Sequence, residues 1–315
     1  MVATTRAPLV AKKRPFLTPR DWLGYLFISP WIIGFLAFTL LPFLASLFLS
    51  FTDWQIVGKW HLIYLANYQK MFSGVDDRFT VALENTVYYA VVNVPGTQII
   101  ALSLALLLRE KARGIGLFRT LFYIPAITTG VGTSYLWAQM FSAQGGPINT
   151  FLGYLGIQGP NWLYSLTWSM PALIIVGLWN VGQSMLIYLA ALHGVPQSLY
   201  DSSSVDGANV IQRFFNITIP MVTPAMFFNV ILGFIGSFQV FTSAFIITNG
   251  GPANATLFYS LYLYQVAFTN LRMGYAAALA WVLFLIILAI TIIQLVAARH
   301  WVYYEGSGPS SAGAK

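Results

Sequence analysis

The chain has 315 residues, of which 57% are hydrophobic and only 8% are charged, and its formal net charge is +7. Repeated apolar stretches approach the roughly 20 residues that a bilayer-spanning helix needs, and no charged segment is long enough to fold as a soluble domain. The composition therefore indicates an integral membrane protein. The sequence contains no cysteine, which excludes disulfides, thiolate metal sites and thiol nucleophiles.

Both ends of the chain are predicted to carry no chemistry. Residues 1–21 are expected to form a cytoplasmic arm whose basic residues set the topology, and residues 299–315 a cytoplasmic tail that ends in a stretch of disordered composition. Residues 22–298 then form a single transmembrane domain. Its first apolar stretch is too long for a signal peptide and lacks a small-x-small cleavage site.

Hydropathy predicts an all-α fold with six membrane-spanning helices. The predicted spans are 23–49, 87–108, 120–141, 169–192, 221–248 and 273–297. The apolar segment 257–268 is too short to cross the bilayer alone. Its three tyrosines favour an interfacial or re-entrant helix, and the Asn-Gly-Gly-Pro sequence at 249–252 predicts a sharp turn before it.

The basic residues predict the orientation. Twelve Lys and Arg residues fall at the two termini and in the loops after the second and fourth spans, against four on the other side, Lys59, Lys70, Arg78 and Arg272. By the positive-inside rule the side with twelve, which holds both termini, faces the cytoplasm. The positive net charge is thus a topology signal, and nucleic acid is not an expected partner, whereas membrane lipid is.

The sequence lacks residues that several classes of protein need for their function. No ionisable residue lies clearly at the middle of a predicted span, which disfavours proton-coupled carriers and, less strongly, sodium-coupled ones. No Gly-x-x-x-x-Gly-Lys-Ser/Thr sequence is present, so the chain is not itself an ATPase. His61, His193 and His300 stand near different span ends without a nearby nucleophile, so neither an enzyme nor a metal site is expected.

A polar loop, 193–220, separates the fourth and fifth spans. Pro196 favours the start of a helix over 197–205, Gly207 allows a turn, and a second helical piece over 209–216 is expected to end at Pro220. Apolar and acidic residues share the first helix. On these residues alone, a surface that docks a soluble partner and a solvated connector are about equally supported.

This loop resembles the signature of a known family, the membrane permease subunits of binding-protein-dependent ABC importers. The signature reads Glu-Ala-Ala, three residues, Gly, nine residues, Ile-x-Leu-Pro, and it corresponds here to Asp201-Ser202-Ser203, Gly207 and Ile217-x-Ile219-Pro220. The two serines make the first helix more polar and slightly less helix-prone than the family pattern. Further motifs, such as Glu84-Asn85-Thr86 and the sequence at 248–252, resemble the carbohydrate-uptake branch of maltose and glycerol-phosphate importers.

The resemblance implies a type I ABC importer permease fold in a prokaryotic inner membrane. It implies three kinds of partner protein: a second, homologous permease subunit, two copies of a cytoplasmic ATPase subunit that bind ATP and Mg²⁺, and an extracytoplasmic solute-binding protein. No cofactor is expected in the chain itself. The residues implied to couple it to the ATPase are Leu199, Tyr200, Asp201, Ser202, Ser203, Asp206, Gly207, Ile217 and Pro220.

Candidate sugar-contacting residues are polar or aromatic side chains inside the spans, because sugars offer hydroxyl groups and apolar ring faces. The candidates are Trp179, Asn180 and Gln183 in the fourth span and Asn229, Ser237 and Gln239 in the fifth. For each, a hydrogen bond between helices is the competing interpretation. The competing function is a self-contained secondary carrier or facilitator, although no internal repeat of the kind such carriers often show is evident.

Overall fold

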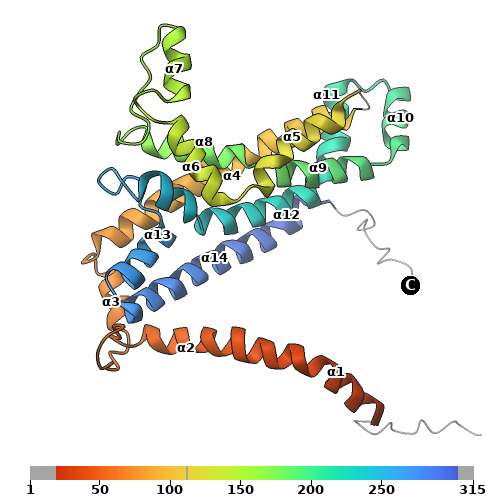
Figure 1. The fold of residues 1–315 in the computed structure, drawn as a ribbon. Helices are drawn as coiled ribbons and strands as arrows, with labels where there is room; N and C mark the ends of the chain where they lie inside the picture. The colour runs from red at the N-terminus through yellow and green to blue at the C-terminus, as the bar shows by residue number, and fades with distance from the viewer. Residues whose placement is uncertain (1–18, 111–112, 304–315) are drawn as a thin grey trace, which may run out of the picture.

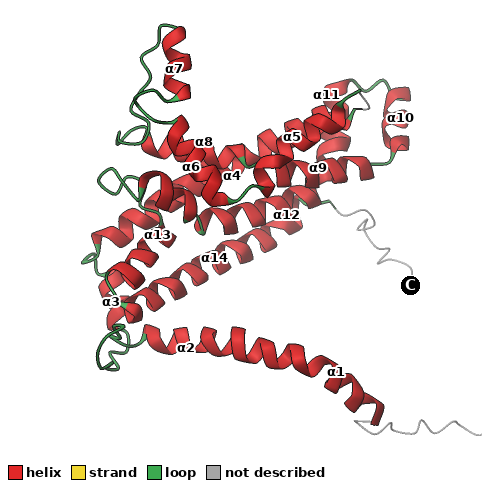
Figure 2. Ribbon diagram, in the orientation of Figure 1, coloured by secondary structure: helices red, strands yellow, loops and turns green. Residues whose placement is uncertain are grey.

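The computed structural model describes residues 19–110 and 113–303 (Figure 1). Within these ranges the protein is helical with no strand, apart from a single bridge between Thr52 and Leu62 (Figure 2). The all-α fold is therefore confirmed. Most of the predicted amino-terminal arm and of the tail lies outside the described residues.

Fourteen α-helices and four short π-helical turns, labelled η, make up the described part of the chain. In chain order they are α1 (Pro19–Phe35), η1 (Leu36–Leu40), α2 (Leu41–Ser50), α3 (Ala66–Phe72), α4 (Asp77–Arg109), α5 (Ile115–Ile127), α6 (Gly130–Met140), α7 (Pro147–Tyr154), α8 (Ser169–Trp179), α9 (Gly182–Gly194), α10 (Gln197–Val205), α11 (Val210–Arg213), η2 (Phe214–Thr218), α12 (Ile219–Phe238), η3 (Ala244–Thr248), α13 (Tyr259–Tyr264), η4 (Gln265–Thr269) and α14 (Met273–Trp301).

Four helices of this part of the chain are long and apolar enough to cross a membrane, and two bent pairs complete the predicted six. The unbroken spans are Trp22–Ser50, Asp77–Arg109, Val210–Phe238 and Met273–Trp301. The third span bends by 100° between α5 and α6, and the fourth bends by 42° between α8 and α9. Neither break was predicted, because hydropathy is averaged over a window and carries no information on backbone direction.

Helix α4 is the central element and packs against α8, α9, α12 and α13. Along its buried face Ala82, Ala90, Ala101 and Ala105 are fully buried. Small side chains let neighbouring helix backbones approach closely, which is the usual way that helices associate in a membrane. By contrast, none of the apolar stretch of the first span is buried, and this span contacts the rest of the protein mainly through α2, which packs against α14 (Figure 1).

Two predicted boundaries around the fifth span are wrong. The span ends at Phe238 instead of residue 248, because the backbone leaves the helix at Gln239 before the short turn η3. Nor does Pro220 end a helix: α11, η2 and α12 run on as one, with Pro220 in the first turn of α12. The π-helical turn explains this, since a bond of Ile219 N–H to Phe214 O skips one residue and lets the helix accommodate a proline that lacks N–H.

The segment 257–268 is a helix buried within the protein. Leu257, Phe258 and Tyr259 are fully buried, and the Tyr259 hydroxyl donates a 2.9 Å hydrogen bond to Leu279 O in α14. Its backbone N–H also donates to Thr86 Oγ1 of α4, at 2.9 Å. The tyrosines that suggested a lipid interface thus serve packing between helices, apart from the half-buried Tyr264.

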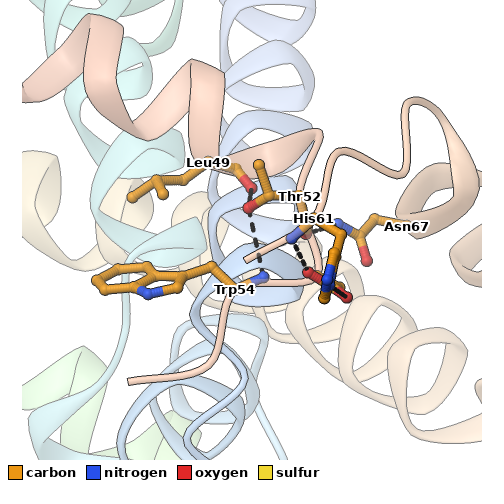
Figure 3. Close-up of polar contacts among 6 residues, drawn as sticks. Leu49, Thr52, Trp54, His61 and Asn67 are labelled. Atoms are coloured by element: carbon orange, nitrogen blue, oxygen red, sulfur yellow. Dashed lines mark hydrogen bonds and ion pairs between the residues drawn. The ribbon is translucent and has the colours of Figure 1, made fainter. Parts of the chain in front are cut away.

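A short loop after α2 is closed by polar contacts (Figure 3). Asp53 Oδ1 accepts a 2.6 Å hydrogen bond from His61 N–H, and Asp53 Oδ2 lies 3.2 Å from His61 Nδ1. At its base Asn67 Nδ2 donates to Ser50 O and Thr52 O at 2.8 and 2.9 Å. The backbone N–H of His61 holds the pKa of Asp53 below its ordinary value, since that bond favours the charged carboxylate.

The beginning of α1 and the end of α14 lie at the same end of the molecule as α10 and α11 (Figure 1). This agrees with an even number of crossings. The loop of Figure 3, α3 and α7 lie at the opposite end (Figure 1).

Candidate functional site

The predicted helix of the polar loop is α10, with the expected bounds Gln197–Val205. It projects from the end of the bundle, joined to α9 by Val195 and Pro196 (Figure 1). Pro196 stands at its N-cap position, where a missing N–H costs no helical hydrogen bond. The helix therefore starts where the sequence predicts and presents its outer side to solvent.

Gly207 makes the turn that ends α10. Its φ of +76° lies in the left-handed region, which residues with a Cβ adopt at a cost. Its N–H donates to Ser204 O at 3.2 Å, and the N–H of Ala208 donates to Ser203 O at 2.9 Å. These two bonds form a Schellman motif, so the direction of the chain after α10 is fixed by backbone hydrogen bonds.

Hydrogen bonds also fix the start of the next helix, α11. Asn209 and Gln212 form a reciprocal capping box, with hydrogen bonds of 2.8 and 2.9 Å between each side chain and the other residue's N–H. Arg213 Nε adds a 2.8 Å bond to Ala208 O. Because α11 continues into α12, the turn joins α10 rigidly to a membrane-spanning helix.

Tyr200 is turned toward the bundle and is half-buried. Its hydroxyl lies 2.9 Å from Thr218 Oγ1 and accepts a 3.2 Å hydrogen bond from Arg109 Nη1, at the end of α4. The Arg109 guanidinium also lies 5.1 Å from the centre of the Tyr200 ring, a cation–π distance. Tyr200 thus anchors α10 to α4 and η2 and offers little of its surface to a partner.

The other predicted residues of the loop divide into an exposed and a packed group. Leu199, Asp201, Ser202, Asp206 and Gly207 are exposed, whereas Ser203, Ile217 and Pro220 are half-buried. Sequence reasoning missed three more exposed apolar side chains, Val210, Ile211 and Phe215. The apolar pair Val210-Ile211, just after the Gly207 turn, was the signal in the sequence that could have revealed them. Together with Val205, which is 89% exposed, they place exposed apolar side chains on both sides of the Gly207 turn.

A cavity of about 460 Å³ lies at the breaks of the third and fourth spans and beside the end of the fifth. Pro125, Thr128 and Gly130 line it at the break between α5 and α6, and Asn180 lines it at the break between α8 and α9. Thr242 and Ser243 line it just beyond the end of α12. Interrupted helices leave backbone polar groups without helical partners, which is tolerated at membrane depth where the backbone lines a cavity or is buried in protein.

Five of the six predicted sugar-contacting residues line this cavity: Trp179, Asn180, Gln183, Asn229 and Ser237. Gln239 does not line it and is exposed at the C-cap of α12. Asn229 also makes the competing helix-to-helix contact, since its Nδ2 donates to Ser184 O at 3.3 Å. Trp179 packs edge-on against Trp137 with ring centres 5.8 Å apart, which leaves 54% of the residue exposed.

Sequence reasoning missed the wall that α4 contributes. Tyr89, Asn93, Thr97 and Gln98 all line the cavity. Tyr89, Asn93 and Thr97 follow a spacing of four, which places them on one face of a helix, and this polar stripe in an apolar span was the available signal. Asn93 Nδ2 also donates to Ile174 O at 3.2 Å, which joins α4 to α8.

The described residues that line the cavity include no Asp, Glu, Lys, Arg or His. Likewise, no cluster of three or more His, Cys, Asp or Glu residues within 19–110 and 113–303 could hold a metal ion. The site therefore offers hydroxyl, amide and aromatic groups, the set that suits uncharged polar molecules.

A bundle of spans around a polar cavity, with a rigid helix projecting at one end, defines a membrane transport permease. The chain belongs to the family of binding-protein-dependent transport system inner membrane components, whose model matches residues 38–302. The resemblance noted from the polar loop is thereby confirmed, as is the location in the membrane as a multi-pass protein.

Relatives match over nearly the whole chain. A probable ABC transporter permease protein, YesP of Bacillus subtilis, is 43% identical over 298 residues, which cover 93% of this chain and 96% of YesP. The lactose transport system permease protein LacF of Rhizobium radiobacter is 36% identical over 312 residues, with coverages of 95% and 99%. The relatives are thus transport permease subunits.

Solved structures share the fold. A chain of a bacterial alginate ABC transporter, crystallised with a periplasmic protein bound to an alginate pentasaccharide, matches with a TM-score of 0.78. The match covers 89% of this chain and 95% of that one at 23% identity. The expected ABC importer permease fold is therefore confirmed.

Proposed function

We propose that this chain forms half of the translocation path of an ATP-driven importer for a sugar or related solute. The observation that carries the proposal is that the same membrane-spanning helices hold both a polar cavity and a projecting helix. A polar, uncharged cavity lies at the helix breaks, and the rigid helix α10 projects from the end of the same spans. Helix α4 contacts both features. It lines the cavity, and Arg109 at its end donates a hydrogen bond to Tyr200 of α10.

In this proposal, α10 transmits the energy of ATP hydrolysis from the ATPase to this chain. The exposed apolar residues Leu199, Val205, Val210, Ile211 and Phe215 dock into a cytoplasmic ATPase subunit, because burying such a surface stabilises a complex. Asp201 and Asp206 are exposed beside them and can pair with basic groups of the partner. ATP and Mg²⁺ are bound by the ATPase, so this chain is a non-catalytic subunit without a cofactor of its own.

The complete importer then contains a second, homologous permease, two ATPase subunits and an extracytoplasmic solute-binding protein. The names of relatives support a carbohydrate solute. They include permeases for lactose, for starch degradation products and for arabinooligosaccharides. The structure of the alginate transporter with its periplasmic protein supports a binding protein as partner.

The proposal also places the chain across the membrane. Residues 1–21, the loop 193–220 and residues 299–315 face the cytoplasm, and residues 22–298 form the transmembrane domain. The common position of α10, the beginning of α1 and the end of α14 supports this orientation (Figure 1).

The test is uptake of radiolabelled sugars by proteoliposomes that contain this chain together with its ATPase, second permease and binding protein. We expect uptake that requires both internal ATP and the binding protein. Equal uptake by this chain alone, without ATP, would contradict the proposal and identify a self-contained carrier.

A further inference from the structure

Four aromatic side chains form an unbroken series of ring contacts that starts at the cavity. Phe241, just after the end of α12, lines the cavity. Its ring stacks on that of Phe245, in η3, with ring centres 5.4 Å apart. The ring centre of Tyr264, the last residue of α13, lies 5.0 Å from that of Phe241 and 5.5 Å from that of Phe245. Phe268 of η4 continues the series, with its ring centre 5.2 Å from that of Tyr264. We call these four residues the aromatic row.

Two helical turns, each with aromatic residues four positions apart, build the aromatic row. Phe245 N–H donates a 2.8 Å hydrogen bond to Phe241 O, so this pair lies on one face of a turn. Tyr264 and Phe268 have the same spacing across α13 and η4. Ser260, four positions before Tyr264, donates a 3.3 Å hydrogen bond from its Oγ to the last carbonyl of α12. That bond turns this face of α13 toward the end of α12, where the other pair begins.

The aromatic row leads from the cavity to the end of the molecule opposite α10. Phe268 lies in η4, which packs against α14. Three residues further on, Leu271 O accepts a 3.3 Å hydrogen bond from the N–H of Ile56, in the loop after α2, which lies at that end (Figure 1). Thr269 and Asn270, which follow Phe268 directly, are exposed and polar. In the proposed orientation, the outer end of the row therefore meets water on the extracytoplasmic side.

The outer rings of the row are open to another molecule, since Phe245 is 41% exposed and Phe268 is 57% exposed. Exposed rings of a membrane protein suit either lipid or a sugar, whose CH-rich ring face packs against an aromatic face. Two observations favour a sugar. The row begins at a wall of the polar cavity, where Thr242 and Ser243 follow Phe241, and it ends beside exposed polar residues. A ring anchored in lipid requires neither.

We propose that the aromatic row is a second sugar-binding site, outside the cavity, on which a sugar ring stacks before it reaches the cavity. Phe245 and Phe268 make the contact, and Tyr264 positions both by touching each ring. Because the row joins the cavity at Phe241, a solute of two or more sugar rings can occupy both sites at once. The chemical class that fits is therefore an oligosaccharide. This inference rests on the proposed function and adds to it a binding site and the class of the sugar.

The first experiment labels cysteines in the complete importer, reconstituted in proteoliposomes with the ATPase inside. The chain has no cysteine of its own, so Phe245→Cys and Phe268→Cys each report one position. The reagent is a charged, membrane-impermeant methanethiosulfonate, which reacts with the thiolate that forms in water. We expect both cysteines to be labelled from outside, because the row faces a watery path in the assembled importer.

The sugar probe is the one that most stimulates ATP hydrolysis among neutral mono- to tetrasaccharides of common hexoses and pentoses. We expect an oligosaccharide, and we expect it to slow the labelling of both cysteines. The matched control is Phe284→Cys in α14. Phe284 is 43% exposed and belongs to another aromatic cluster, with Phe43 and Trp281, but it does not line the cavity. A cysteine there should stay unlabelled.

The second experiment measures uptake of the same oligosaccharide. Phe245→Leu and Phe268→Leu keep an apolar side chain and remove the ring. We expect each to lower uptake efficiency roughly three- to tenfold, as for one lost aromatic contact. Phe245→Tyr keeps a ring and should retain most of the uptake. Phe284→Leu is the control and should not change it.

Four outcomes would overturn the inference. They are no labelling of the two row cysteines, labelling that the probe sugar does not slow, wild-type uptake in both leucine variants, or a monosaccharide as the best stimulator. The first would mean that lipid or the second permease covers the row. Stimulation by none of the sugars would instead contradict the proposed function, so the two failures are distinguishable.

Discussion

The guanidinium of Arg109 lies 5.1 Å from the ring centre of Tyr200, and its Nη1 donates a 3.2 Å hydrogen bond to the Tyr200 hydroxyl. Arg109 ends α4, the helix that carries Tyr89, Asn93 and Gln98 along the cavity. Tyr200 belongs to α10, the helix proposed to dock into the ATPase. A movement of α10 therefore reaches the cavity wall through a direct contact with α4, without intervening loops.

Replacing Tyr200 tests this contact. Tyr200→Phe keeps the ring and removes the hydroxyl, whereas Tyr200→Ala removes both. We expect stability losses of about 1 and 2 kcal/mol, because the site is half-buried and the hydrogen bond has a charged donor. The number of sugars transported per ATP should fall in the same order. Tyr154→Phe, at an exposed tyrosine of α7, is the control and should change neither quantity.

The turn at Gly207 is predicted to be essential for coupling. Gly207→Pro forces φ near −65° in place of +76° and removes the N–H that donates to Ser204 O, a local cost of roughly 3 kcal/mol. We expect membrane insertion to persist while sugar-stimulated ATP hydrolysis is lost. Wild-type coupling in this variant would contradict the role of α10.

Gly156 provides a matched control for this substitution. It ends α7 with φ of +74°, and its N–H donates to Gly153 O, so its local geometry is the same as that of Gly207. It follows α7, which lies at the opposite end of the molecule from α10 (Figure 1). Gly156→Pro should therefore cost similar local stability and leave ATP hydrolysis coupled to transport.

Asp76 is predicted to hold three helices together. It caps α4 by accepting a 3.3 Å hydrogen bond from Phe79 N–H, and its Oδ2 accepts bonds from the hydroxyls of Tyr262, at 2.5 Å, and Tyr275. Asp76→Ala removes the cap and leaves two tyrosine hydroxyls unpaired. We expect a loss of about 2 to 4 kcal/mol, seen as a lower Tm of the purified protein. Asp77→Ala, at the exposed neighbouring position, should change Tm little.

The loop of Figure 3 is predicted to depend on pH through Asp53. Its pKa lies below the ordinary value of 3.8 because the His61 N–H favours the charged form. The folded pKa is depressed, so the contribution to loop order is present above pH 3.8 and is lost as pH falls through the lower folded pKa. Exchange protection of the His61 amide, corrected for the intrinsic rate, should follow this course. The same pH dependence of protection in Asp53→Asn, which has no carboxylate to titrate, would contradict the assignment to Asp53.

Much of this architecture follows from the sequence, for identifiable physical reasons. Span positions depend on apolar composition, and α10 depends on local signals, Pro196 and Gly207, so both were predictable. The helix breaks at Thr128 and Asn180 were not predictable, because a single threonine or asparagine lowers the mean hydropathy of an apolar span only slightly. The inward position of Tyr200 depends on Arg109, a residue distant in sequence. Gln98 was overlooked because its partner, Tyr188, belongs to another span.

Site-specific cross-linking tests the central claim, that this chain receives its energy through α10, most directly. The chain has no cysteine, so a single introduced cysteine carries a photo-crosslinker without background. Val205 of α10 is 89% exposed, and Val57 in the loop at the opposite end is 80% exposed, which makes Val205→Cys and Val57→Cys a matched pair. In the assembled importer, we predict that Val205→Cys cross-links to the ATPase subunit and that Val57→Cys does not. A cross-link from Val57→Cys to the ATPase, or none from Val205→Cys in a complex that still couples transport to ATP, would contradict the account.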